Sequence, residues 1–181
     1  MSTHSPIHAS AQAPAKSVTT VSCACGQVVY EAKGAPITSV ICYCDDCQEG
    51  ARQIELLPHA PPVQEPDGGT AYLAYRKDRV TCVRGQSLLR HHKIRAGSAT
   101  NRVLATCCNS AMLISFDDAK HWVDLYRSRC NGDNWPVQMR ICTKFKAAHH
   151  IIPAGVPQHP HYPLSLIMKL VRARFAMLLH R

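Results

Sequence analysis

The residues in this chain best suited to chemistry are its cysteines. The sequence holds ten of them in 181 residues, and seven fall into three tight groups: Cys23-Ala24-Cys25, Cys42-Tyr43-Cys44-Asp45-Asp46-Cys47 and Cys107-Cys108. Zinc binds thiolates at about 2.3 Å in a tetrahedron, and cysteines spaced as C-x-C or C-x-x-C offer two ligands from one short loop. Cysteines one residue apart seldom form a disulfide with each other, because so short a loop strains the bond. The spacing therefore favours metal binding over disulfide bridges.

The second group can bring three sulfurs to one ion from only six residues. Cys42, Cys44 and Cys47 would leave one coordination position open, which is the arrangement of catalytic rather than structural zinc. A helix is expected to begin at Asp45, capped by that residue, and to end near Pro58. A thiol in its first turn would be kept ionised by the helix dipole. The alternative is a packed or redox-active thiol cluster.

The first group needs partners from far along the chain, and Cys107 and Cys108 are the natural candidates. Together with Cys23 and Cys25 they would form a second, closed metal site that ties the start of the sheet to its end. Adjacent residues of an extended segment point to opposite sides, so both sulfurs can reach one ion only if the backbone is kinked there. In the alternative, one of the two is simply a buried small side chain.

The three remaining cysteines lack ligand spacing. Cys82 lies in an expected strand and is predicted to pack in the core, whereas Cys130 and Cys142 are predicted to be free thiols. The histidine pairs His91-His92 and His149-His150 have no companion ligands at a useful spacing, and we interpret them as surface or hydrogen-bonded residues.

The sequence predicts that short strands position these residues. The expected strands are residues 27–30, 37–41, 71–75, 79–83, 87–90 and 112–116, separated by turn signals. Runs of this length and spacing predict a mainly β fold built on a small antiparallel sheet. A second helix is expected near residues 164–180, where apolar residues recur at helical spacing. Residues 1–17 read as a disordered leader, residues 18–117 as the zinc-binding domain and residues 118–181 as a basic extension.

Composition and charge narrow the class of protein. A hydrophobic share of 46% excludes wholesale disorder. No apolar run approaches the ~18 residues of a transmembrane helix, and the first residues do not resemble a signal peptide, so a cytoplasmic location is predicted. A reducing compartment would keep the thiols free for metals.

The net charge of +9 is concentrated near the C-terminus. Residues 120–181 hold 10 Lys and Arg against 2 Asp and Glu, whereas residues 1–119 hold 11 against 10. Such a basic segment could bind nucleic acid or another acidic surface, although a solvated face is the simpler interpretation. The residues that would contact phosphates are Lys144, Lys146, Lys169, Arg172, Arg174 and Arg181.

The order C-x-C-G, then C-x-C-x-x-C, then a later cysteine motif resembles the domain shared by glutathione-dependent formaldehyde-activating enzymes and centromere protein V. The resemblance covers roughly residues 18–117 and implies an Mss4-like β-tent with a structural zinc and a second zinc at the active site. By position, Cys23 and Cys25 match the structural pair, and Cys42, Cys44 and Cys47 match the active-site ligands.

The later family motif, F-C-x-x-C-G, is altered in this chain. Cys108 keeps its second cysteine, Ala105 replaces the first and Asn109 replaces the glycine. We expect Cys107 to supply the missing ligand from a shifted position. The departure points to a divergent branch of the family.

The resemblance implies carbon–sulfur lyase chemistry on glutathione and formaldehyde, of the kind that forms S-hydroxymethylglutathione. One or two Zn²⁺ ions and glutathione are the expected cofactor and substrate. The alternative is a non-catalytic domain whose fold is stabilised by zinc, with or without a basic tail that binds nucleic acid.

Overall fold

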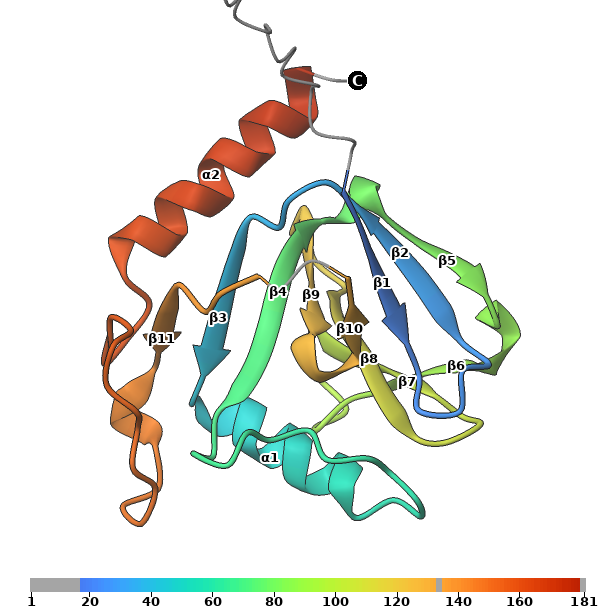
Figure 1. The fold of residues 1–181 in the computed structure, drawn as a ribbon, viewed down its shortest axis with the longest axis horizontal. Coiled ribbons are helices and arrows are strands. Elements are labelled where there is room, and N and C mark those ends of the chain that lie inside the picture. The colour runs from blue at the N-terminus through green and yellow to red at the C-terminus, as the bar shows by residue number, and fades with distance from the viewer. Residues whose placement is uncertain (1–16, 133–134, 180–181) are drawn as a thin grey trace, which may run out of the picture.

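The computed structural model describes residues 17–132 and 135–179, and in this part the chain is mainly β with two α-helices (Figure 1). The predicted fold class is confirmed. The predicted disordered leader, apart from Ser17, lies outside the described residues. Neither helix of the described part has the length and apolar character that crossing a membrane requires.

A four-stranded antiparallel sheet forms one layer. Its strand order is β10 (Cys130–Asn131), β1 (Val18–Ser22), β2 (Val29–Lys33) and β5 (Val80–Arg84). Burial alternates along β1 and β2, which is the pattern of strands with one face on a core.

A seven-stranded sheet forms the second layer. Its order is β11 (Met139–Ile141), β3 (Thr38–Cys42), β4 (Thr70–Arg76), β9 (Trp122–Tyr126), β8 (Ser110–Phe116), β7 (Thr100–Ala105) and β6 (Leu89–His92). Neighbours are antiparallel except β11 and β3, which run parallel. Every residue of β3 and β4 is buried, because both faces of the sheet are covered. Short 3₁₀ turns occur at Lys77–Arg79, Gln86–Leu88, Arg127–Arg129 and Thr143–Phe145.

Successive residues of the larger sheet enter two different cores. Leu73 of β4 packs with Val21 and Tyr30 of the smaller sheet. Its neighbour Tyr72 faces the other side and packs with Ile54 of helix α1 (Asp45–Glu55) and Leu166 of helix α2 (Leu164–Leu179). The helices therefore cover the face of the large sheet that the small sheet leaves free.

The strands that follow residue 117 belong to these sheets. β9 lies between β4 and β8, β10 pairs with β1, and β11 pairs with β3. The folded unit thus extends past the expected boundary at residue 117, because strand pairing draws residues 122–141 back into it. The helix expected near 164–180 is present as α2.

Helix α1 begins within the C-x-C-x-x-C segment, at the residue after Cys44. Cys44 occupies the N-cap position rather than the expected Asp45, which is the first helical residue. The backbone N–H groups of Cys47 and Gln48 donate to the Cys44 carbonyl at 3.0 and 3.1 Å. The helix ends at Glu55, three residues before Pro58.

Gly50 lets α1 approach the sheet closely. A Cβ atom there would lie 1.9 Å from Nε of Arg102, whose side chain is fully buried beneath the helix. We expect Gly50→Ala to lower the free energy of unfolding by about 1–3 kcal/mol, because displacing a buried guanidinium outweighs the ~1 kcal/mol that alanine contributes to helix propensity. Urea denaturation measures the change. Gly97→Ala is the control, since a Cβ at Gly97 meets nothing within 4 Å; equal stability of the two variants would contradict the prediction.

Candidate metal centres

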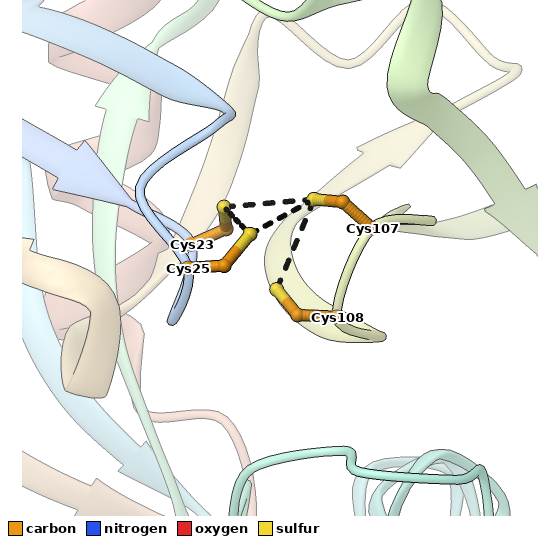
Figure 2. A group of neighbouring side chains, drawn as sticks. All are labelled: Cys23, Cys25, Cys107 and Cys108. Atoms are coloured by element: carbon orange, nitrogen blue, oxygen red, sulfur yellow. Dashed lines mark hydrogen bonds between the residues drawn. The ribbon is translucent and has the colours of Figure 1, made fainter.

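Four sulfurs meet between the β1–β2 loop and the β7–β8 turn, and we call Cys23, Cys25, Cys107 and Cys108 the four-cysteine group (Figure 2). Their Sγ atoms all lie within 4.8 Å of one another. Cys23 lies 3.5 Å from Cys25 and 3.8 Å from Cys107, Cys25 lies 3.3 Å from Cys107, and Cys107 lies 3.9 Å from Cys108. Sulfurs bound tetrahedrally at about 2.3 Å stand about 3.8 Å apart, so the group fits one zinc ion.

A tight turn allows both adjacent cysteines to face the same point. The Cys108 N–H donates to the Ala105 carbonyl at 3.3 Å, and Asn109 adopts a left-handed φ of 51°. This is the kink that the sequence required. Ser110 connects the two loops, because its Oγ accepts from the Ala24 N–H at 3.0 Å and lies 3.1 Å from the Cys108 sulfur.

The thiols of this group differ in pKa. Burial opposes ionisation of Cys108, but hydrogen bonds from Ser110 and from the Cys25 backbone outweigh it and lower its pKa to about 6. Burial and hydrogen bonds with Cys25 and Cys23 raise the pKa of Cys107. Four thiols this close can all become thiolates only with a cation among them, which is the chemistry of a closed zinc site.

A second set of sulfurs stands where β3 ends and α1 begins. Cys42, Cys44 and Cys47, the three-cysteine group, also lie within 4.8 Å of one another. Cys47 is in the first helical turn, as expected, and the Tyr72 hydroxyl donates to its sulfur at 3.5 Å. Hydrogen bonds from Cys42 and Cys47 lower the pKa of Cys44 to about 3, with help from the charge of Arg102.

The three-cysteine group opens onto a cavity of about 350 Å³ between the large sheet and α2. Apolar side chains form much of its wall: Val40, Ile114, Phe116, Trp122, Leu166 and Leu170. Tyr72, Tyr162, Arg102 and Asp124 also line it. An apolar cavity with a few polar groups beside a metal-binding set is the usual form of a small-molecule site.

Arg102 brings a positive charge to this cavity. Its side chain is 1% exposed, and Nη2 donates to the Asp46 carbonyl, while Nε and Nη1 have no hydrogen-bond partner. Unpaired donors this deeply buried cost stability, which is tolerated where they serve a ligand. This residue could not be singled out from the sequence, because Arg102 stands between the polar Thr100-Asn101 and the apolar Val103-Leu104-Ala105 and belongs to no motif.

Asp124 faces the same cavity from β9. Burial raises its pKa to about 7, against a hydrogen bond from Trp122 and the charge of Lys120. The carboxyl group is therefore close to half protonated at neutral pH and can give or take a proton there. Asp124 could not be singled out from the sequence, because a single acidic residue in a strand belongs to no motif.

The remaining cysteines and histidines lie elsewhere, with one exception. Cys82 donates to the Arg84 carbonyl at 3.3 Å and Cys130 to the Tyr126 carbonyl at 3.4 Å. No histidine of the described residues joins a potential metal-binding group. The exception is Cys142, which was predicted to be a free thiol and whose sulfur is hydrogen-bonded to that of Cys42.

Comparison with known proteins bears on the first part of the chain. Residues 18–55 match the family model described as glutathione-dependent formaldehyde-activating enzyme. This match agrees with the family resemblance carried by the first two cysteine motifs. It contains Cys23 and Cys25 together with the whole three-cysteine group. The mainly β architecture with its cysteine clusters is consistent with an Mss4-like fold.

A solved structure of a Rhodobacter sphaeroides protein is similar to this chain at 15% identity. The alignment covers 64% of this chain and 90% of that one, with a TM-score of 0.45. The search of curated proteins gives no match.

The two groups predict two independent metal ions. We expect the purified protein to hold two zinc ions per chain, and Cys25→Ser and Cys44→Ser to hold one each, because each variant loses a sulfur from a different group. Elemental analysis with protein quantitation measures the ratio. Cys82→Ser should keep two ions. Loss of both ions in either variant would show that the sites are not separate.

Asp124 predicts a pH dependence of stability. Its pKa of about 7 in the folded protein lies above the 3.8 of a free aspartate, so between these values the folded protein keeps a proton that the unfolded chain has lost. The free energy of unfolding therefore falls as pH rises from about 4 to 7 and levels off above 7. Asp124→Asn should lack this component, and urea denaturation across the range tests it. A difference between the two proteins that does not vary with pH would contradict the assignment.

Proposed function

We propose that the three-cysteine group holds a zinc ion at which a thiol adds to a small aldehyde, with glutathione and formaldehyde as the reactants and S-hydroxymethylglutathione as the product. The reverse reaction makes the protein a carbon–sulfur lyase. The observation that carries the proposal is that three sulfurs, a buried guanidinium with two unpaired nitrogens and a carboxyl group with a pKa near neutral all line one cavity.

Zinc, when bound, would lower the pKa of a thiol and hold the resulting thiolate beside the aldehyde. Cys42, Cys44 and Cys47 fit this task, because three thiolates leave a tetrahedral ion one position for an exchangeable ligand. The apolar wall of the cavity excludes water, which strengthens every charged interaction inside.

Two polar side chains of the cavity would then act on the aldehyde oxygen: Arg102 on its negative charge and Asp124 on its protonation. As the carbon–sulfur bond forms, the carbonyl π electrons move to the aldehyde oxygen, and the free N–H groups of Arg102 would stabilise the developing negative charge. Protonated Asp124 would give that oxygen its proton, so the proton lost by the thiol is replaced in the product hydroxyl. In the reverse direction Asp124 takes the proton back.

The four-cysteine group supports a structural role instead. It is closed, with four sulfurs for one ion, and it ties a loop of the small sheet to a turn of the large sheet. We propose that zinc there stabilises the fold.

The ten thiols fit a reducing compartment, so we propose a cytoplasmic location. Nucleic-acid binding by the basic residues gains no support from the described part of the chain.

Exchange spectroscopy tests the activity, because glutathione and formaldehyde also combine without a protein. The zinc-loaded protein should accelerate the exchange between free glutathione and S-hydroxymethylglutathione, seen as broadened or exchange-coupled NMR signals. Cys44→Ser should return the rate to the uncatalysed value and Cys82→Ser should not. An uncatalysed rate with the wild-type protein carrying two zinc ions would exclude this activity.

Arg102 and Arg95 offer a matched pair of substitutions. Both contact Asp46, but the Arg95 pair is exposed at the surface, with 2.7 Å between Nη2 and the carboxylate. Arg102→Met should lower the catalysed rate on the order of 10²-fold with zinc content unchanged, the usual effect of losing one oxyanion donor. Arg95→Met should leave the rate unchanged. Equal rates in the two variants would remove Arg102 from the mechanism.

A further inference from the structure

A fourth sulfur stands beside the three-cysteine group, from a part of the chain 95 residues downstream of Cys47. Strand β11 runs parallel to β3, and Ile141 is paired with Cys42. Cys142 follows directly, is 2% exposed, and is hydrogen-bonded through its sulfur to the sulfur of Cys42. It is not one of the three sulfurs that all lie within 4.8 Å of one another, so it stands at the edge of the group.

A buried network holds this sulfur in place. Arg140 of β11 is in ion-pair contact with Asp67 and also contacts the hydroxyl of Tyr43, which donates to Asp67 at 2.9 Å. Tyr43 lies between Cys42 and Cys44 in the sequence, and Arg140 lies two residues before Cys142. The loop of the three-cysteine group and the strand that carries Cys142 are therefore fastened to the same buried carboxylate.

The backbone at Cys142 is strained. Its φ of 59° lies in the left-handed region, which is unfavourable for a residue other than glycine. The turn that follows is closed by a bond from the Phe145 N–H to the Cys142 carbonyl at 3.1 Å, and that bond needs no thiol. A strained, buried residue with a reactive side chain points to a role for that side chain.

The surroundings of Cys142 are those of a metal-bound thiolate. Tyr162 is hydrogen-bonded to the Cys142 sulfur, just as Tyr72 donates to Cys47. The Tyr162 phenol, which lines the cavity beside Cys42, Cys44 and Cys47, also interacts electrostatically with all four of these cysteines. Hydrogen bonds from such outer groups orient metal ligands and moderate their charge.

We propose that Cys142 is the fourth thiolate of the three-cysteine centre when no substrate is bound, and that an incoming thiol takes its place. The second half of this proposal rests on the proposed function. In the exchange a metal–sulfur bond to Cys142 breaks and one to the substrate forms, while the substrate's proton passes to the Cys142 sulfur. The charge of the centre does not change and nothing is oxidised. A resident thiolate would also keep water off the metal, which selects thiols as ligands over water.

Cobalt(II) reports on the number of sulfur ligands, because each bound thiolate adds to the near-ultraviolet charge-transfer absorption. With cobalt at both centres the proposal gives eight thiolates per chain, four from each centre. Cys142→Ser should lose about one-eighth of the absorption and Cys130→Ser none. Adding 2-mercaptoethanol should restore the lost absorption in Cys142→Ser and leave the intensity of the wild-type spectrum unchanged.

X-ray absorption on the wild-type zinc protein provides a second measurement that needs no variant. Four sulfurs per zinc, averaged over both ions, would support the proposal. An average nearer three and a half with an oxygen ligand, or a wild-type cobalt spectrum that gains intensity with thiol, would overturn it and leave the proposed function intact. Four sulfurs in a protein that does not accelerate the glutathione–formaldehyde exchange would instead support Cys142 as a ligand and refute the proposed function.

Discussion

Thiolates gathered in a protein interior repel one another, and this repulsion is the constraint that the rest of the molecule must satisfy. Both cysteine groups bring sulfurs to within 4.8 Å of one another, and apart from the exposed Cys25 their members are buried or half-buried, so that water screens their charges incompletely. Each group therefore needs protons or a cation, and in each the chain supplies donors to the sulfurs: Ser110 in the four-cysteine group, Tyr72 and Tyr162 beside the three-cysteine group. Arg102 adds a positive charge beside the three-cysteine group and helps to lower the pKa of Cys44.

The large sheet places the two centres on opposite sides of the same layer. Side chains alternate along each strand, so one set packs against the small sheet and the other faces the helices and the cavity. The four-cysteine group lies with the first core and the three-cysteine group with the second. Changes in the cavity wall can therefore be made without disturbing the interface between the sheets.

The spacing of cysteines along the chain was enough to predict both groups, because C-x-C and C-x-x-C loops act locally. It also predicted that Cys107 and Cys108 would need a kink, which Asn109 supplies. The second helix followed from apolar periodicity, and the first from its N-terminal cap and the proline beyond its end. Runs of β-type residues bounded by turns predicted several strands, but β1, β7, β9, β10 and β11 were not predicted. Arg102, Asp124 and Cys142 could not be found in this way, since strand pairing between distant segments places each of them near the three-cysteine group or its cavity. The basic charge of the last third suggested a separate extension, but charge does not report strand pairing: β9 lies inside the large sheet and β11 forms one of its edges.

Helix α2 contributes Leu166 and Leu170 to the cavity wall but has only two fully buried side chains, Leu166 and Met177. A contact from His121 to the Leu170 carbonyl at 2.8 Å adds a polar attachment. Elements that bury little apolar surface separate from a fold at a smaller free-energy cost than core strands do. The sheet side of the cavity is consequently rigid, whereas its helix side can adjust. The size of ligand that fits therefore depends on how far α2 can move away from the sheet.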